Sequence, residues 1–289
     1  MNSPRRKATK TVQSGRPLVS LNLARDKKLF DLVEVIEPSR HRDELILSPQ
    51  NIRAFAGLLE EFRHADTLRR HGLSIRSKLL FCGPPGCGKT VTAEVFAHEL
   101  GLPLLVARLD SIISSYLGET ATNLKLVFEA VSNEPCVLFL DEFDALARTR
   151  TEGAEHSELR RVVNNLLLMI DRYHGRGFLV AATNLEESLD AAIWRRFDEV
   201  ILFDHPREKQ IRELIALKTR NFPLNFELGT VVSKLVGLSY ADIERVCMNA
   251  IKRSILKDAN KIDETNFSIA IREEMRRQQV RNRIKAEDF

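Results

Sequence analysis

The sequence predicts an α/β fold: a three-layer sandwich around a five-stranded parallel sheet, followed by a small all-α domain. Five short runs are almost continuously apolar, which is typical of strands buried on both faces of a sheet. These runs are 78–82, 104–107, 136–140, 178–182 and 199–203. The segments between them carry apolar residues at helical spacing, for example over 124–131 and 159–170. Because strands and helices alternate, we expect βαβ crossovers and a parallel sheet.

Near Pro206 the strand signal ends, and four helical segments follow. They are 207–221, 226–236, 240–257 and 265–277. Ser239 and Asp242 have the spacing of a capping pair at the start of the third segment. Before the first strand, residues 29–76 have a mostly helical pattern, with one helix expected over 49–71. We expect four parts: a basic, flexible segment over 1–40, a large α/β domain over 41–205, a helical domain over 206–275 and a tail over 276–289.

The composition is that of an ordinary globular protein, with 44% hydrophobic and 29% charged residues. We find no apolar run of about 18 residues, as a membrane span requires, and no apolar signal region near the start of the chain. The four cysteines form no CxxC pair and no cluster with histidine at zinc spacing; they are Cys82, Cys87, Cys136 and Cys247. Reduced cysteines that serve as small apolar residues are typical of cytosolic proteins. We therefore expect a cytoplasmic protein that has no contact with a membrane.

The net charge of +4 is unevenly distributed along the chain. Residues 1–28 hold eight Lys and Arg against one acid, whereas residues 29–271 hold 30 basic against 35 acidic residues. The folded body is therefore mildly acidic, which argues against nucleic acid as its ligand. The basic N-terminal segment would suit an anionic partner, but a solvated, disordered tail is the favoured interpretation.

Residues 83–90, GPPGCGKT, lie between a predicted strand and a predicted helix, and this context indicates a phosphate-binding loop. The loop residues are Gly83, Pro84, Pro85, Gly86, Cys87, Gly88, Lys89 and Thr90. Glycines let backbone amides wrap phosphate groups, while Lys89 supplies a positive charge for the β- and γ-phosphates. Thr90 offers a hydroxyl to Mg²⁺ and starts a helix whose N-terminus favours anions. The loop therefore indicates that the chain binds ATP together with Mg²⁺.

Two further strand ends carry polar residues that ATP hydrolysis requires. Asp141 and Glu142 follow the run 136–140, and Asn184 lies just after the run 178–182. Because ligands of open α/β sheets lie at the carboxyl ends of the strands, these residues should meet the phosphate loop. We expect Asp141 to hold Mg²⁺, Glu142 to act as base toward the attacking water, and Asn184 to hold that water or the γ-phosphate. Without the loop, such residues would more often belong to ordinary turns.

Together these elements resemble the AAA family of ATPases over about residues 43–275. The stretch 189–198, LDAAIWRRFD, is similar to the second region of homology of that family, in the Arg-Arg-Phe form of katanin and spastin. The chain looks like a compact, single-ring bacterial member of the family, some of which are encoded beside a subtilisin-like protease. The resemblance implies a P-loop NTPase sandwich with the sheet order 5-1-4-3-2 along the five runs, and a small helical lid.

The resemblance makes Arg195 and Arg196 arginine fingers that reach the γ-phosphate of a neighbouring subunit. Two guanidinium groups can neutralise the charge that develops in phosphoryl transfer. A finger supplied in trans implies a homo-oligomeric ring, which is a hexamer in most members of the family. Outside that family context, an Arg-Arg pair at a helix end is usually a solvated basic pair.

The stretch 115–119, SYLGE, looks like the first pore loop of the family. In that role Tyr116 and Leu117 would face a central channel and grip an unfolded protein chain. A core tyrosine at a helix edge is the alternative for Tyr116. The polar segment 149–158 fits either a second pore loop or an ordinary mobile loop.

The region around the nucleotide base departs from the family pattern. The family's Asp-Ile-Gly-Gly is replaced by DELIL over 43–47, where Ile46 is the residue that we expect beside the base. In the lid, Lys218 replaces the family's histidine and Tyr240 replaces a glycine, while Arg245 is a candidate sensor arginine. These departures concern contacts between the lid and the nucleotide rather than hydrolysis.

The resemblance implies an ATPase ring that remodels, unfolds or threads protein substrates. We recognise no protease, nuclease or microtubule-binding module in the sequence, so a separate protease or effector is a candidate partner. The alternative is a nucleic-acid ATPase of the loader type, which the basic ends of the chain favour and the acidic body and the Tyr-Leu-Gly motif oppose. A nucleotide switch without hydrolysis is a third interpretation, against which Glu142 and the arginine pair argue.

Overall fold

The computed structural model describes residues 27–109, 112, 119–143, 157–184 and 191–287. In this part of the chain the order of strands across one six-stranded sheet is β1-β3-β4-β5-β2-β6. The strands are β1 (Val33–Ile36), β2 (Lys78–Cys82), β3 (Leu104–Ala107), β4 (Val137–Leu140), β5 (Phe178–Thr183) and β6 (Glu199–Leu202). The pairs formed among β2 to β6 are all parallel, and these five strands coincide with the five apolar runs. The predicted α/β class with a parallel sheet is therefore confirmed.

The sheet differs from the prediction by one strand. β1 pairs with β3 in the antiparallel direction, with Val33 opposite Ala107 and Ile36 opposite Leu104. The expectations of a helix over this stretch and of a flexible segment up to residue 40 are therefore wrong for residues 33–36. The four-residue run VEVI is too short to show a period, and it becomes a strand because it pairs with the open edge of β3. The five parallel strands keep the neighbours that the family resemblance implies.

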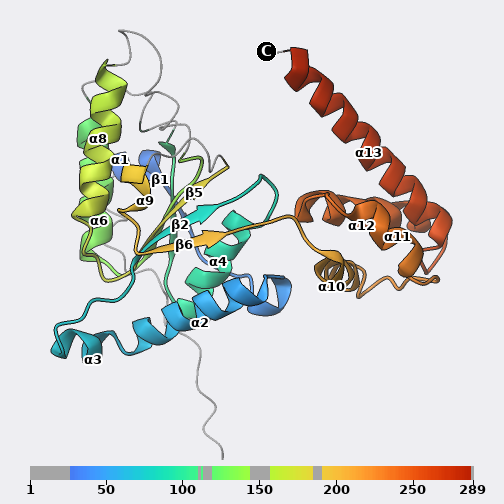
Figure 1. Cartoon of the computed structure of the whole chain (residues 1–289), viewed down its shortest axis with the longest axis horizontal. Helices are drawn as coiled ribbons and strands as arrows, with labels where there is room; N and C mark the ends of the chain where they lie inside the picture. The colour runs from blue at the N-terminus through green and yellow to red at the C-terminus, as the bar shows by residue number, and fades with distance from the viewer. Residues whose placement is uncertain (1–26, 110–111, 113–118, 144–156, 185–190, 288–289) are drawn as a thin grey trace, which may run out of the picture.

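Helices cover both faces of the sheet (Figure 1). α1 (Lys27–Leu32), α6 (Thr120–Asn133) and α8 (Ser157–Asp171) supply one buried core, and α2 (Pro49–Arg63) and α4 (Lys89–Leu100) supply the other. Successive side chains of a strand point to opposite faces, so β2 sends Leu80 to the first core and Leu79 and Phe81 to the second. The sheet is thus buried on both sides, as its apolar runs predict. The described part of the sandwich also contains the short helices η2 (Arg42–Glu44), α3 (Ala65–Arg70) and α9 (Ala191–Trp194).

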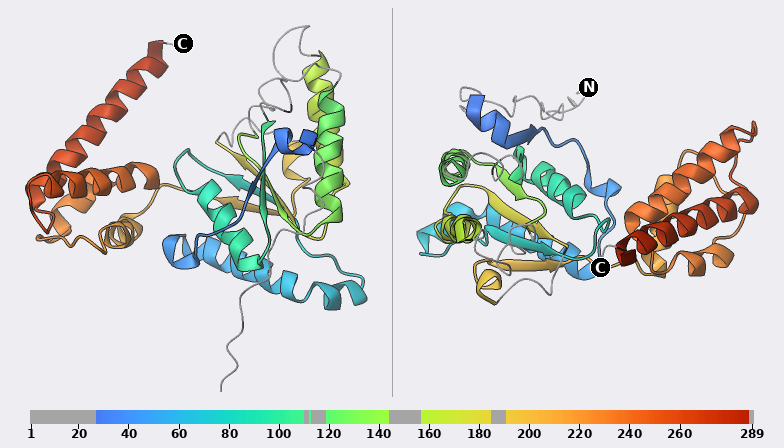
Figure 2. Two further views of the ribbon diagram at one scale, coloured as in Figure 1. Left: turned by 180° about the vertical axis from the view of Figure 1, so that it is seen from behind. Right: turned by 90° about the horizontal axis from the view of Figure 1, so that it is seen from above.

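Beyond β6 the described chain is helical and forms a lid with a core of its own. The lid helices are α10 (Glu208–Lys218), α11 (Gly229–Leu235), α12 (Tyr240–Ile255) and α13 (Glu264–Glu287). The two views of Figure 2 show the lid beside the sandwich, and its left view shows the last turns of α13 extending away from the other lid helices. No described helix combines the length and the apolar character needed to cross a membrane.

The end of the chain differs from the expected tail. α13 continues to Glu287, ten residues past 277, where we expected the last helix to end, and well past 275, the expected end of the helical domain. Its second half, MRRQQVRNRIKAE, has too few apolar residues to show a helical period, but it is rich in residues with high helix propensity. The helix therefore continues on propensity after its buried face has ended.

Candidate functional site

The loop between β2 and α4 has a backbone that only glycine accommodates at its key positions. Gly83 has φ +144°, and a Cβ atom built on it would lie 2.0 Å from the carbonyl oxygen of Phe203. Gly88 has φ +91° and caps the N-terminus of α4 in a left-handed conformation. Strand, loop and helix thus follow one another as the sequence predicts, with the N-terminal amides of α4 at the loop.

Lys89 occupies the first position of α4, and it is 7% exposed. Its ammonium group donates hydrogen bonds to the carbonyl oxygens of Gly83 at 2.6 Å and Pro84 at 3.1 Å. It also donates to Asn184 Oδ1 at 2.8 Å, at the end of β5. The loop therefore holds the ammonium group in a fixed place beside the strand end that carries Asn184.

Thr90 and the end of β4 provide neighbouring oxygen atoms. The Thr90 hydroxyl lies 3.2 Å from Asp141 Oδ2, and the N–H of Glu142 donates to Asp141 Oδ1 at 2.9 Å. The exposed Glu142 has a backbone φ of +52°, which residues other than glycine seldom adopt. The next residue, Phe143, is buried, and its N–H donates to the carbonyl of Ala182 at 2.8 Å, which anchors this turn to β5. A hydroxyl and a carboxylate are ligands that Mg²⁺ accepts, so the donor set fits this ion.

Sheet topology explains why these residues meet. β5 lies between β2 and β4, and all three run in parallel, so their carboxyl ends share one edge. The phosphate loop follows β2, Asp141 follows β4 and Asn184 follows β5. The structure therefore brings together Lys89, Thr90, Asp141 and Asn184, as predicted from their positions after the strands.

A cavity of about 320 Å³ runs from these strand ends to the lid. Residues 85–90 of the loop, Asp141, Glu142 and Asn184 line one end of it. Ile46 lies in its wall, together with five lid residues. These lid residues are Leu214, Lys218, Tyr240, Ala241 and Glu244. The phosphate loop and the predicted base-side residue Ile46 thus border one space.

One feature of the lid side of the cavity was not predicted from the sequence. Lys218 donates a hydrogen bond to Glu244 at 2.6 Å, which joins α10 to α12 in the cavity wall. Glu244 lies one turn after Tyr240 on α12. That helical spacing is the one signal in the sequence that could have placed Glu244 beside Tyr240 in the cavity wall. Burial raises the pKa of the Cys87 thiol to about 11, so this loop residue is neutral near pH 7.

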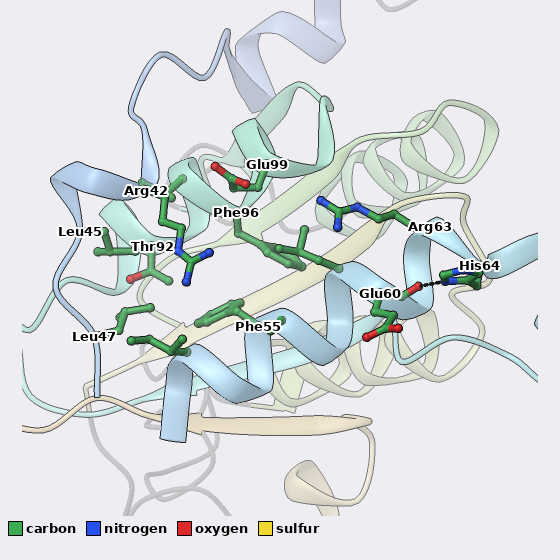
Figure 3. Close-up of a pocket in the computed structure, with 14 residues that line it drawn as sticks. Arg42, Leu45, Leu47, Phe55, Glu60, Arg63, His64, Thr92, Phe96 and Glu99 are labelled. Carbon is green, nitrogen blue, oxygen red and sulfur yellow. Dashed lines mark hydrogen bonds between the residues drawn. The ribbon is translucent and has the colours of Figure 1, made fainter. Parts of the chain in front are cut away.

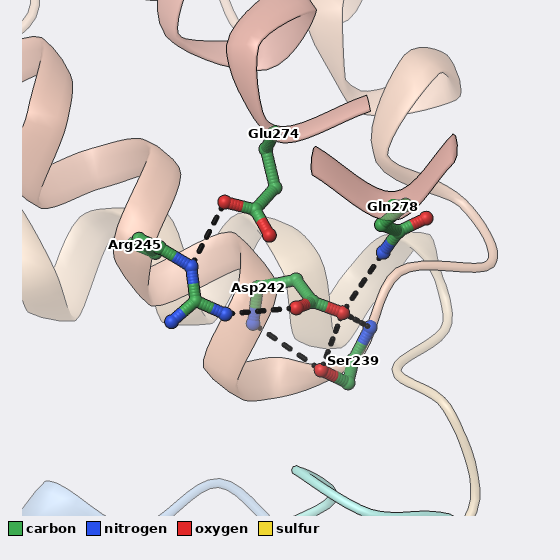
Figure 4. Close-up of polar contacts among 5 residues, drawn as sticks. All are labelled: Ser239, Asp242, Arg245, Glu274 and Gln278. Carbon is green, nitrogen blue, oxygen red and sulfur yellow. Dashed lines mark hydrogen bonds and ion pairs between the residues drawn. The ribbon is translucent and has the colours of Figure 1, made fainter. Parts of the chain in front are cut away.

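Arg245 does not line the cavity, as far as the described residues show. Its guanidinium group donates to Asp242 Oδ1 at 3.0 Å and to Glu274 Oε2 at 2.8 Å (Figure 4). Ser239 caps α12 together with Asp242, as their spacing predicts. Arg245 therefore ties α12 to α13, and the hypothesis of a sensor arginine at this position gains no support from its contacts.

The arginine pair lies elsewhere on the sandwich. Arg195 is exposed, and Arg196 donates from Nε to Asp171 Oδ2 at 3.0 Å, at the end of α8. Neither is among the described residues that line the cavity. Both predicted pore-loop residues, Tyr116 and Leu117, lie outside the described residues, as do 149–156 of the second candidate loop and 189–190.

A larger cavity of about 430 Å³ lies between α2 and α4. Figure 3 shows the rings of Phe55 and Phe96 among the side chains that line it, together with Arg42 and Arg63. Its described lining includes no residue of the phosphate loop and none of Asp141, Glu142 and Asn184. We therefore take the smaller cavity, where the catalytic candidates meet, as the functional site.

The comparisons with known proteins agree with this geometry. Residues 79–205 match the model of the "ATPase family associated with various cellular activities (AAA)". The chain is 55% identical over 254 residues to an uncharacterized AAA family ATPase, y4kL, from Sinorhizobium fredii; the match covers 88% of this chain and 77% of that protein. The chain belongs to the AAA family of ATPases. As a member of that family it binds nucleotide and is an ATP hydrolase.

Other relatives of this AAA ATPase are longer proteins. An "ATP-dependent zinc metalloprotease FtsH" from Halothermothrix orenii is 30% identical over 223 residues, which are 74% of this chain and 35% of that protein. A "Cell division cycle protein 48 homolog" from Archaeoglobus fulgidus is 31% identical over 265 residues, 88% of this chain and 36% of that protein. The chain thus spans about a third of the length of these two relatives.

Proposed function

We propose that this AAA ATPase hydrolyses ATP with Mg²⁺ in the cavity between sandwich and lid, and that a homo-oligomeric ring uses the energy to remodel or unfold proteins. The observation that carries the chemical part is the convergence of three strand ends. Lys89 Nζ lies 2.8 Å from Asn184 Oδ1, and Thr90 Oγ1 lies 3.2 Å from Asp141 Oδ2. A triphosphate wrapped by the loop would meet all four side chains.

Each residue at the phosphate end has a separate role in this proposal. Lys89 binds oxygens of the β- and γ-phosphates, and the amides of the loop and of the first turn of α4 bind the chain of phosphates. Thr90 and Asp141 would hold Mg²⁺. Bound there, Mg²⁺ would neutralise charge on the phosphate oxygens.

Glu142 is the proposed base. It accepts a proton from water as the water oxygen bonds to the γ-phosphorus and the bond from the γ-phosphorus to the bridging oxygen breaks, which leaves ADP and phosphate. Asn184 orients that water or the γ-phosphate from the neighbouring strand end.

Replacing Glu142 tests this role directly. Glu142→Gln should still bind ATP but lose about 100-fold or more in turnover, because a general base contributes roughly that factor. The control is Glu129→Gln on the exposed face of α6, which removes an acid of the same type from a surface ion pair with Lys125. ATP binding is measured by calorimetry and turnover by phosphate release. Normal turnover by Glu142→Gln would refute the assignment.

The proposed ring supplies Arg195 and Arg196 to the cavity of a neighbouring subunit. AAA proteins generally form oligomeric rings, and we propose a hexamer. The separation of the pair from the lining of its own cavity supports a role in trans. The guanidinium groups would stabilise negative charge in the transition state, so isolated subunits should hydrolyse ATP slowly.

Protein is the proposed substrate, and Tyr116 and Leu117 are proposed to grip it. The names of the relatives support this, since FtsH is described as an ATP-dependent protease, and a separate protease is a candidate partner here. Rings of Glu142→Gln in ATP should retain bound substrates, so they can be used to isolate them. Tyr116→Ala should keep basal ATP turnover but process the isolated substrates more slowly. The competing function is a nucleic-acid loader, favoured by the basic N-terminal segment. DNA-stimulated turnover at physiological salt that is lost on removal of residues 1–28 would support the loader instead.

A further inference from the structure

The nucleotide cavity has two chemically different ends. One end holds the phosphate loop, Lys89 and the acids that follow β4. The other end lies against the lid, where Leu214, Tyr240 and Ile46 provide apolar surface, and Tyr240 is aromatic, unlike the other described lining residues. A ligand that fits both ends carries phosphates on one side and a flat, weakly polar group on the other.

Tyr240 also forms part of the wall between this cavity and a second one of about 310 Å³. The two cavities share Ile46, Cys87 and Tyr240 as lining residues. The second cavity is bordered by the start of α2, the end of β6 and the start of α10. Removing the Tyr240 ring would therefore open the lid end of the nucleotide cavity into this second space.

The backbone beside Tyr240 is held directly on the phosphate loop. The N–H of Ala241 donates to the carbonyl of Gly86 at 3.1 Å. The contact is close, because a Cβ atom on Gly86 would lie 2.7 Å from Ser239 Oγ. The Tyr240 ring is half-buried and packs against the core of the sandwich and the core of the lid. Its distance from the phosphate end is therefore set by the fold rather than by a flexible loop.

The phenol of Tyr240 stays neutral. Burial raises its pKa above the ordinary range, and the neighbouring Cys87, Glu213 and Asp204 act in the same direction. A neutral ring offers an aromatic face to a heterocycle and adds no negative charge beside the phosphates.

We propose that Tyr240 is the residue that holds the base of the bound nucleotide, with its ring packed on the face of the heterocycle at the end of the cavity opposite Lys89. The inference rests on the proposed function, because it requires ATP in this cavity. Lys218 and Glu244, paired at 2.6 Å in the same wall, offer a donor and an acceptor to the edge of the base. Stacking on an aromatic ring adds affinity for any base, while the polar pair adds preference among bases.

The test compares a ligand that has a base with one that lacks it. The affinities of the full-length protein for ATP and for inorganic tripolyphosphate, both with Mg²⁺, are measured by calorimetry. Tyr240→Ala should weaken ATP binding about tenfold, near the lower end of the effect of losing a base–aromatic stack. Tripolyphosphate should bind within about twofold of wild type, since its contacts lie at the loop.

Two variants separate stacking from packing. Tyr240→Phe should bind both ligands as wild type does, and Tyr240→Leu, which fills the wall without an aromatic face, should weaken ATP alone. Phe222→Ala is the control, because Phe222 is a half-buried lid aromatic that is not among the described lining residues of either cavity. It should change neither affinity.

The outcomes distinguish this inference from the function on which it rests. A wild-type protein that binds neither ligand overturns the proposed function and this inference with it. If wild type binds both ligands, the proposed function stands and the variants decide the inference. It is overturned if Tyr240→Ala and Tyr240→Leu keep full ATP affinity, or if they bind ATP and tripolyphosphate more weakly by the same factor. Equal weakening would mean that Tyr240 acts by supporting the loop.

Discussion

Two adjacent acids on α13, Glu273 and Glu274, provide a matched test of how the lid holds its last helix. Glu274 is 3% exposed and accepts a hydrogen bond from Arg245 at 2.8 Å. Glu273 is 46% exposed and pairs with Arg253. Arg245 also binds Asp242, which in turn accepts a hydrogen bond from Gln278 at 3.0 Å (Figure 4). Glu274 thus belongs to a network that joins α12 to α13, whereas Glu273 forms a surface pair.

The expected cost of each alanine substitution follows from this difference in burial. Removing one partner of a buried pair costs about 3–5 kcal/mol, while an exposed pair contributes about 0–1 kcal/mol. Arg245 is 35% exposed and retains Asp242, so we take the lower end, about 3 kcal/mol, for Glu274→Ala. Alanine is a strong helix former at both positions, so helix propensity does not separate the two variants.

Hydrogen exchange followed by mass spectrometry measures the opening of α13 directly. A loss of about 3 kcal/mol raises the open fraction roughly 150-fold, so the amides of α13 should exchange faster by about that factor in Glu274→Ala. In Glu273→Ala the acceleration should stay below about fivefold. Equal acceleration in the two variants, or none in Glu274→Ala, would refute the conclusion that the buried network holds α13 on the lid.

Three further predictions concern the loop, the ring and pH. Gly83→Ala should abolish ATP binding in calorimetry, because the new Cβ would lie 2.0 Å from the Phe203 carbonyl oxygen, whereas Gly229→Ala, with nothing within 4 Å, should bind normally. Lys89→Ala and Arg196→Ala should each be nearly inactive alone but release phosphate when mixed. Asp171→Ala should behave as Arg196→Ala does, because it removes the carboxylate 3.0 Å from Arg196 Nε. A mixture no more active than its separate components would contradict arginine fingers supplied in trans. Burial opposes ionisation of Asp242, but hydrogen bonds from Ser239 and Arg245 outweigh it and lower its pKa. A lowered pKa in the folded state stabilises the lid above the unfolded pKa of about 4, and this stabilisation is lost as pH falls through the folded value. The melting temperature should therefore be steady near neutral pH and fall below about pH 4, and it should fall less in Asp242→Asn. Identical changes of melting temperature with pH in the two proteins would refute this.

The sequence was most informative where the fold depends on short, local patterns. The five apolar runs predicted β2 to β6, because strands buried on both faces must be apolar at every position. The loop GPPGCGKT fixed its own structure, since positive φ angles at Gly83 and Gly88 are available to glycine at little cost. The residues Asp141 and Asn184 could be placed at one edge because parallel strands end at the same side of a sheet.

The tertiary structure decided the features that depend on distant parts of the chain. β1 became a strand by pairing with β3, about 70 residues away; the β-branched residues of VEVI suit a strand, but four residues do not indicate a partner. Arg245 became a structural tie because Glu274 of α13 lies against it, and Tyr240 became part of the wall of the proposed nucleotide cavity because α12 docks on the loop after β2. By itself, the sequence determined the fold class and the position of the glycine-rich loop and of the polar residues after the strands, since these follow from burial and backbone conformation in contiguous stretches. The tertiary structure decided the edge strand, the lid network and the lid end of the cavity, because each forms from side chains that only long-range packing brings together.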